Sequence, residues 1–276
     1  MTGISESGTR DSGTITILGC GSSGGVPRVG QGWGACDPAN PRNGRLRCSI
    51  LVERRNTSGA TRVLVDMSPD LRQQLLSTGL DSLDAVVLTH SHADHTHGID
   101  DIRPLVLNMH RRIEVHMDAA TSRDVTEKFA YVFRTPAGSL YPPLLDERRL
   151  TAGEERAFTG AGGSIVMLPF RLDHGEIDAL GLRVGGVAYT PDLNGIPPES
   201  EGSLEGLDLW IIDALRHKPH PSHFSLREAL DAIARFKPRR AVLTNLHTDL
   251  DYAKLRAELP PGVEPAYDGM ALPFAP

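Results

Sequence analysis

The feature that most constrains this chain is a dense group of metal-binding side chains directly after a short apolar segment. Four such side chains fall within six residues of the segment LTHSHADHTHG: His90, His92, Asp94 and His95. They follow Ala85–Leu88, whose sequence AVVL predicts a buried strand. Residues two apart in an extended segment project to the same side, and the turn that follows can direct the last two ligands to a second point. The segment therefore predicts that four ligands at the end of a strand bind two cations rather than one.

Two divalent ions about 3.5–4 Å apart can hold a phosphoryl or acyl oxygen and make hydroxide available near neutral pH. The segment thus indicates hydrolytic chemistry. Two alternatives are surface histidines in a polar loop and a single structural zinc site. The length of the motif, its compactness and its position after a strand favour the two-metal interpretation.

The composition limits the other possibilities. A chain of 276 residues with 39% hydrophobic residues can bury a large core, and its net charge of −6 gives no general attraction for nucleic acid. There is no run of 18 apolar residues, and three cysteines are too few for a disulfide framework. We therefore expect a cytoplasmic protein with no membrane partner and no long nucleic acid partner.

The chain divides into two parts. Residues 1–13 are polar and predict a disordered leader, and residues 14–276 predict a single domain.

Strands and helices alternate along the chain. Short apolar segments predict strands at Thr14–Leu18, Ser49–Glu53, Arg62–Val65, Ala85–Leu88, Ser164–Leu168, Leu180–Val184, Leu209–Ile212 and Ala241–Leu243. One helix is expected from Ser68 as N-cap to a stop at Gly79, and a second over Ser225–Phe236 with Ser225 as cap. This order predicts an α/β domain in which helices cover sheets. The pattern alone leaves open a doubly wound sheet or a four-layer sandwich.

The central motif resembles the HxHxDH signature of the metallo-β-lactamase superfamily, and four further motifs follow the order of that superfamily. They are Asp66 at the end of RVLVD, His174 in RLDHG, Asp192 in AYTPD and His247 in LTNLH. The resemblance covers residues 14–270. It implies a four-layer αββα sandwich with the metals at the edge where the two sheets meet.

The same resemblance implies a complete ligand set for two divalent transition metal ions. The first ion would be bound by His90, His92 and His174, and the second by Asp94, His95 and His247. Asp192 would bridge both ions, and Asp66 would orient a ligand or the attacking water, so that Asp66 and Asp94 also count among the catalytic residues. Mixed imidazole and carboxylate ligands suit zinc and manganese alike.

Segments outside the metal motifs resemble a narrower family, the phosphoribosyl cyclic phosphate phosphodiesterases of phosphonate metabolism. These segments are GCGSSGGVPRVGQGWGACDPANPRNGRLRCSILVE, THGIDDIRPL, HPSHFSLREAL and EPAYDGM. The resemblance implies that His223, just before a helix, is the general acid that protonates the leaving alkoxide after a bridging hydroxide attacks. The expected substrate is a small cyclic phosphate or a nucleotide-like phosphodiester, and a homodimer is possible in such a family.

Some features depart from the family or have two interpretations. The opening loop offers only Cys36 where the phosphonate enzyme has a cysteine-rich metal site, so an extra structural zinc is not expected. The glycine-rich Gly19–Gly25 segment either faces a phosphate or forms a tight turn, and Arg103 either meets substrate or forms a salt bridge. Two other functions remain open. One is thioester or lactone hydrolysis, which does not need His223, and the other is non-catalytic metal or nucleotide binding in cofactor biosynthesis.

Overall fold

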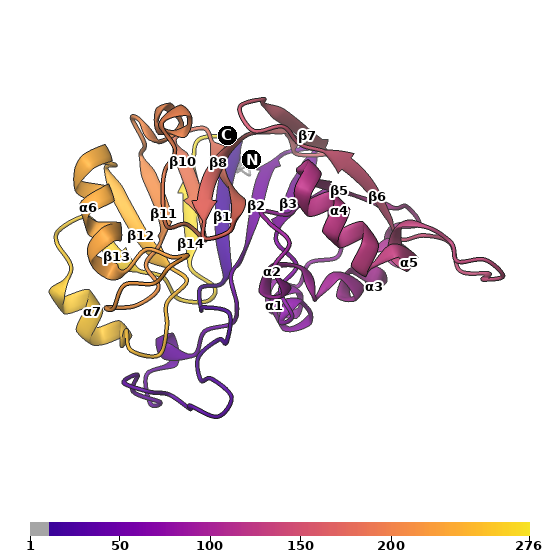
Figure 1. The fold of residues 1–276 in the computed structure, drawn as a ribbon. Helices are drawn as coiled ribbons and strands as arrows, with labels where there is room; N and C mark the ends of the chain where they lie inside the picture. Colours follow the sequence, from indigo (N-terminus) through magenta and orange to yellow (C-terminus); the bar gives the residue numbers. More distant parts are fainter. Residues whose placement is uncertain (1–10) are drawn as a thin grey trace, which may run out of the picture.

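Two seven-stranded sheets pack face to face in the computed structural model, which describes residues 11–276 (Figure 1). The first sheet has the order β14 (Ala271–Phe274), β1 (Ser12–Gly19), β2 (Ser49–Asn56), β3 (Gly59–Val65), β4 (Ala85–Val87), β5 (Ile113–Met117) and β6 (Leu145–Arg149). The second has the order β13 (Val263–Pro265), β12 (Arg240–Thr244), β11 (Leu209–Asp213), β10 (Val187–Thr190), β9 (Ile177–Val184), β8 (Gly163–His174) and β7 (Arg156–Gly160).

Helices cover the outer face of each sheet. The first sheet is covered by α1 (Leu71–Thr78), α3 (Arg103–Met109), α4 (Ala119–Lys128) and α5 (Ala130–Phe133), and the second by α6 (Leu226–Phe236) and α7 (Tyr252–Glu258). The short helix α2 (Ala93–Thr96) and the 3-10 turns η1 (Pro41–Asn43), η2 (Ile99–Ile102) and η3 (Pro198–Leu204) lie in connecting segments. The predicted four-layer αββα sandwich is therefore confirmed.

Three apolar clusters hold the layers together. The central cluster fills the space between the sheets, with Ile17 and Val63 from one side and Leu182 and Ile211 from the other. Each of the other two clusters joins one sheet to its helices. Strands that are buried on both faces read as continuous apolar segments, which is why the sequence marks β4 and β12 so clearly.

The boundaries correct two predictions. Strand β1 begins at Ser12, so the predicted leader is too long by two residues, and residues 1–10 lie outside the described part of the chain. Helix α1 begins at Leu71 rather than next to Ser68, because a turn closed by the Leu71 amide and the Ser68 carbonyl at 2.9 Å comes first. The Ser68 hydroxyl accepts from the Asp70 amide within this turn and donates to the Gln74 side chain. The predicted stop at Gly79 is correct, and this residue adopts a left-handed conformation with φ of 64°.

No helix within residues 11–276 combines the length and the apolar character that a membrane span requires. The parallel strands of the two sheets determine where the candidate site residues lie. In the first sheet β3, β4, β5 and β6 run parallel, and in the second β10, β11, β12 and β13 do so. Polar residues that follow these strands converge at one edge of the sandwich.

Candidate metal centre

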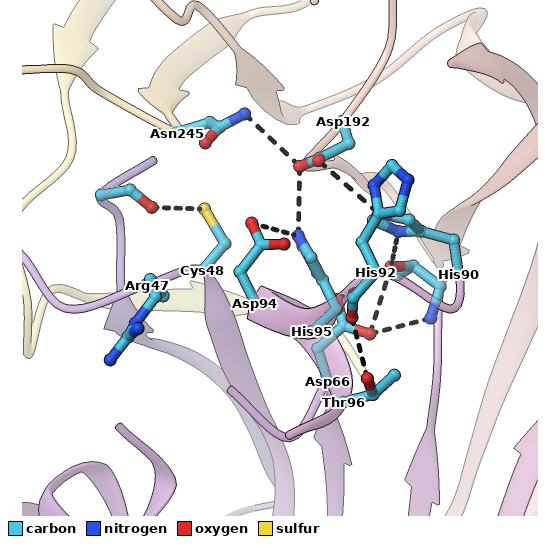
Figure 2. Close-up of polar contacts among 12 residues, drawn as sticks. Arg47, Cys48, Asp66, His90, His92, Asp94, His95, Thr96, Asp192 and Asn245 are labelled. Carbon is cyan, nitrogen blue, oxygen red and sulfur yellow. Dashed lines mark hydrogen bonds and ion pairs between the residues drawn. The ribbon is translucent and has the colours of Figure 1, made fainter. Parts of the chain in front are cut away.

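Three histidines from two sheets face a common point. His90 and His92 follow β4, and His174 is the last residue of β8. The distance from His174 Nε2 to His92 Nδ1 is 3.2 Å, and each of the three rings offers a ligand nitrogen within 4.8 Å of the others. We call these residues the trihistidine cluster. Figure 2 shows Asp192 beside His90, and its Oδ2 is 3.7 Å from His90 Nε2. The same oxygen is 3.6 Å from His174 Nε2.

The rings of His90 and His174 are each held through Nδ1, so that their Nε2 atoms face the common point. His90 Nδ1 lies 3.0 Å from Thr89 Oγ1, and His174 Nδ1 donates to the Ser222 carbonyl at 2.7 Å. His90 Nε2 is buried and has no hydrogen-bond partner among the described residues. An unpaired buried imidazole nitrogen is costly unless a cation takes its lone pair. Three imidazoles and a carboxylate oxygen thus fit a divalent transition metal ion.

A second set of ligands lies on the other side of Asp192. His95 Nε2 is 3.4 Å from Asp192 Oδ1 and 3.5 Å from Asp94 Oδ2. Behind it, Asp66 accepts from His95 Nδ1 at 2.7 Å and from the Thr89 amide at 2.8 Å. Asp66 is completely buried and has a positive φ of 65°, a conformation that is uncommon for any residue other than glycine. The structure therefore places Asp66 where it orients His95, and brings Asp94 and Asp192 to the same ring.

Charges in this centre are strongly coupled. Burial lowers the pKa of His90 well below its ordinary value, so this ring is neutral and able to bind a metal. Burial opposes the charge on His95, but the carboxylates of Asp192 and Asp66 raise the pKa of that ring well above normal. Burial likewise opposes the charge on Asp192, yet His95 holds the pKa of Asp192 well below its ordinary value. A cation held by His95 Nε2, Asp94 and Asp192 would satisfy the same two carboxylates in place of a proton on that nitrogen.

His247 requires a correction. The groups of ligand atoms that the described residues bring together include neither His247 nor Asp94, although Asp94 lies 3.5 Å from His95 Nε2. His247 Nε2 instead contacts the Arg28 guanidinium, and His247 Nδ1 lies 3.2 Å from Asp249 Oδ1. A ring nitrogen that accepts from a guanidinium has no lone pair left for a metal ion. The structure therefore does not support the prediction that His247 binds the second metal.

Asn245, two residues before the predicted ligand His247, is the residue of this segment that contacts Asp192. It is buried directly after β12 and has a positive φ of 59°, which asparagine tolerates better than most residues. Its amide nitrogen donates to Asp213 Oδ1 at 3.1 Å and lies 3.4 Å from Asp192 Oδ1. An amide that donates to both carboxylates links them without adding a charge. Asn245 was not predicted, because the segment LTNLH contains a histidine and histidine is the more common metal ligand.

His223 lies next to the centre and pairs with a buried carboxylate. Its Nδ1 is 2.9 Å from Asp213 Oδ2, and its ring centroid is 4.7 Å from that of His174. Burial opposes the charge on His223, but the hydrogen bond and charge of Asp213 raise the pKa of His223 to about 9. Burial raises the pKa of Asp213 to about 7. The proton of the pair rests on the imidazole, because Asp192 and Asp94 also favour the positive charge there.

Asp213 is a functional residue that the sequence analysis missed. A signal was present, since Asp213 ends the apolar strand LWIID just as Asp66 follows the apolar strand RVLV.

The structure also shows the contacts of Arg103 and Cys36, for which the sequence left two interpretations open. Arg103 forms an ion pair with Asp100 at 3.0 Å, and the Cys36 thiol donates to the Thr248 carbonyl at 3.4 Å. Among residues 11–276, no group of candidate metal ligands contains a cysteine.

Comparison with known proteins identifies the family. Residues 61–245, more than half of the chain, match the family described as the beta-lactamase superfamily domain. The solved structure of a new diphosphatase from the PhnP family is 34% identical, with a TM-score of 0.85 over 95% of this chain and 97% of that one. The chain therefore belongs to the β-lactamase superfamily and, within it, to the PhnP family. Within this family fold, the described residues bring together a histidine and aspartate cluster that could hold a metal ion.

Other relatives carry different names. The chain is 36% identical over 259 residues to a protein of Porphyromonas gingivalis named octanoyltransferase, a match that covers 92% of this chain but 50% of that protein. It therefore spans about half the length of that relative. The zinc-bound PqqB of Methylobacterium extorquens has a TM-score of 0.73 at 18% identity, over 94% of this chain and 99% of that one. At that identity the likeness concerns the fold alone.

Proposed function

We propose that the chain is a phosphodiesterase that hydrolyses a small cyclic phosphate or a nucleotide-like phosphodiester. One observation carries this proposal: the imidazole of His223, held by Asp213 at 2.9 Å, lies beside the trihistidine cluster. Cleavage of a diester with a poor leaving group needs a proton at the departing oxygen, and a positioned imidazolium supplies it. The PhnP-family relative, as a diphosphatase, adds support because it too cleaves bonds to phosphorus.

The side chains have distinct tasks in this mechanism. A divalent ion at the trihistidine cluster would polarise a phosphoryl oxygen and make hydroxide available near neutral pH. Thr89 and the Ser222 carbonyl fix the rings of His90 and His174 so that their inner nitrogens face the ion. Asp213 accepts from His223 Nδ1, so the proton for the leaving oxygen is the one on Nε2.

We further propose that two ions bind with unequal affinity. The first site offers three imidazoles and an oxygen of Asp192, whereas the second offers one imidazole and the carboxylates of Asp94 and Asp192. Asn245 directs an amide N–H toward Asp192 at 3.4 Å, and an N–H group repels a cation. Zinc and manganese both fit these donors.

Hydrolysis of an acyl thioester or lactone is a second candidate function. The observation that favours it is the 36% identity to half of a protein named octanoyltransferase. The same metal centre can polarise an acyl oxygen, and a thiolate leaving group hardly needs a proton from His223. The two functions therefore differ in their dependence on this residue.

A substrate panel tests both candidates. Protein loaded with zinc or manganese is assayed with bis-p-nitrophenyl phosphate, a cyclic nucleotide, a cyclic ribose phosphate and an octanoyl thioester. We expect turnover of the cyclic nucleotide or of the cyclic ribose phosphate. Turnover of the thioester alone would reject the phosphodiesterase proposal. Tight metal binding without turnover of any compound would instead favour a non-catalytic role.

A further inference from the structure

The segment that follows β10 lies between two others that carry residues of the proposed mechanism. On one side, the Asn194 amide donates at 2.8 Å to the carbonyl of Asp173, the residue before His174. On the other side, the Leu193 carbonyl accepts at 2.7 Å from the amide of Phe224, in the loop between β11 and α6. This one segment therefore contacts both the end of β8 and the loop before α6.

The Asn194 side chain makes a second link between the same two parts of the chain. Its Oδ1 accepts from the Gly175 amide at 2.9 Å, and its Nδ2 donates to the Pro221 carbonyl at 2.8 Å. These partners are 19 and 27 positions away in sequence, whereas an asparagine in an ordinary turn bonds to backbone two residues further on. One exposed amide therefore joins the residue after His174 to the residue two before His223.

The two parts that Asn194 joins also contact each other directly. His174 Nδ1 donates to the carbonyl of Ser222, the residue just before His223, at 2.7 Å. Gly175 has a φ of 64°, and a Cβ atom there would lie 2.9 Å from Ser222 Cβ. Because the backbones approach so closely, a shift of either one changes the separation of the His174 and His223 rings, whose centroids are 4.7 Å apart.

Two carbonyl groups fasten the part of the loop next to His223. Within residues 11–276, the Pro221 carbonyl accepts a hydrogen bond from Asn194 alone, and the Ser222 carbonyl accepts one from His174 alone. Without the Asn194 side chain, the Pro221 carbonyl would be left to water and the Ser222 bond would hold this part of the loop by itself. A loop held by few hydrogen bonds opens at a low cost in free energy.

We propose that Asn194 is a positioning residue, which holds His223 at the distance from the metal centre that proton transfer to the leaving oxygen requires. Its side chain bonds to the backbone of Gly175 and Pro221, so it acts through these segments rather than on the substrate. A misplacement of about 1 Å, even from a change far from the chemistry, can cost ~10²-fold in rate. The inference rests on the proposed function, because that function gives His223 the role of acid.

A double-mutant cycle tests whether Asn194 acts through His223. Asn194→Ala should retain its metal, leave KM nearly unchanged and lower kcat about 10–100-fold on a diester with a poor leaving group. The same change made in His223→Ala should have little further effect, because the residue through which it acts is already gone. Asn194→Gln keeps the amide on a longer side chain and should recover part of kcat. Asn108→Ala is the matched control, because Asn108 is an exposed asparagine on α3 that donates to the Asp81 carbonyl at 3.1 Å.

Hydrogen exchange measures the same link without turnover. In the metal-loaded protein, Asn194→Ala should speed the exchange of backbone amides in residues 214–224, and Asn108→Ala should leave their exchange unchanged. Unchanged exchange in Asn194→Ala would overturn the inference whether or not the protein hydrolyses a phosphodiester.

The kinetic outcomes separate this inference from the proposed function. Losses that add in the double variant would overturn the inference, because Asn194 would then act on something other than His223. An equal loss of kcat on bis-p-nitrophenyl phosphate, whose leaving group needs no proton, would overturn it as well. If exchange in residues 214–224 rises as expected while no phosphodiester is hydrolysed, the link from Asn194 to the His223 loop stands and the proposed reaction falls.

Discussion

His223 has one ring nitrogen engaged by Asp213 and the other available to substrate, so its removal should affect one chemical step. We expect His223→Ala to retain its metal yet lose about 10²–10⁴-fold in turnover of a diester with a poor leaving group. The loss on bis-p-nitrophenyl phosphate should be much smaller, because p-nitrophenolate leaves without a proton. Steady-state kinetics on both substrates, with metal analysis of the same samples, makes the comparison.

The difference between the two substrates is the diagnostic result. Equal losses on both would show that His223 binds phosphate or supports the structure rather than donating a proton. No loss on either would remove the proposed second step and strengthen the thioester or lactone alternative.

The pH profile gives an independent prediction for the same pair. The pKa of His223 is raised to about 9, so its acid form is present below that pH and is lost as the pH rises through it. Turnover of a diester with a poor leaving group should therefore decline near pH 9. Asp213→Asn removes the charge that raises this pKa, and the decline should move to lower pH. A profile that is identical in wild type and Asp213→Asn would contradict the assignment.

The metal ligands differ in what their loss should do. Asp192 contacts His90, His95 and His174, whereas His247 contacts Arg28 and Asp249. Asp192→Ala should therefore lose most of its bound metal, and His247→Ala should keep the wild-type content. Elemental analysis of the purified variants measures this. A large loss of metal in His247→Ala would restore this residue to the ligand set.

Much of the site was predictable because its residues are close in sequence or follow apolar strands. His90, His92 and His95 belong to one segment, and the structure brings His174 and Asp192 to them from the other sheet. Geometry alone separates Asn245 from His247, since both residues lie in the same loop. The Asn245 side chain contacts Asp192, whereas the His247 side chain contacts Arg28. The sequence LTNLH does not show which of the two residues faces the metal centre.

At the scale of elements, the clearest sequence signals gave the correct structure. The predicted cap of α6 is confirmed, since Ser225 Oγ accepts from the Glu228 amide and the Glu228 side chain accepts from the Ser225 amide. Some elements that the sequence did not predict are short: α5, β13 and β14 have three or four residues each, too few to show periodicity. The ten-residue helix α4 was missed as well, because most of its residues are polar and only Val125 is a buried apolar side chain.

The cap of α6 also supports a prediction about stability. The N-cap of α6, Ser225, lies two residues after His223, so the first turn of the helix fixes the loop that carries the proposed acid. Ser225→Ala should lower the free energy of unfolding by about 0.5–2 kcal/mol. Ser225→Asp, which keeps an acceptor, should lose less. Urea denaturation of both variants measures the effect, and an unchanged midpoint for Ser225→Ala would show that the cap contributes nothing.

At the scale of the whole molecule, the two sheets have the same order of antiparallel and parallel strand pairings. Each begins with three antiparallel pairings and continues with three parallel ones, from β14 to β6 in the first and from β7 to β13 in the second. Asp66 follows the first parallel strand of one sheet and Asp192 that of the other. The sequence shows no repeat because this likeness concerns topology, and the metal centre lies where the two equivalent edges meet.

This arrangement makes the metal a link between the two halves of the sandwich, because His90 and His95 follow strands of the first sheet while His174 and Asp192 belong to the second. An ion that binds only the folded chain stabilises it by about 4 kcal/mol when its free concentration is 1,000 times Kd. Chelation should therefore lower Tm by about 5–15 °C for a chain of this size.

Calorimetric scans before chelation, after chelation and after zinc is added back measure the change in Tm. His174→Ala is the matched variant, and its Tm should respond much less to the chelator. A wild-type Tm that does not change on chelation would mean that the two halves are joined by their apolar core alone.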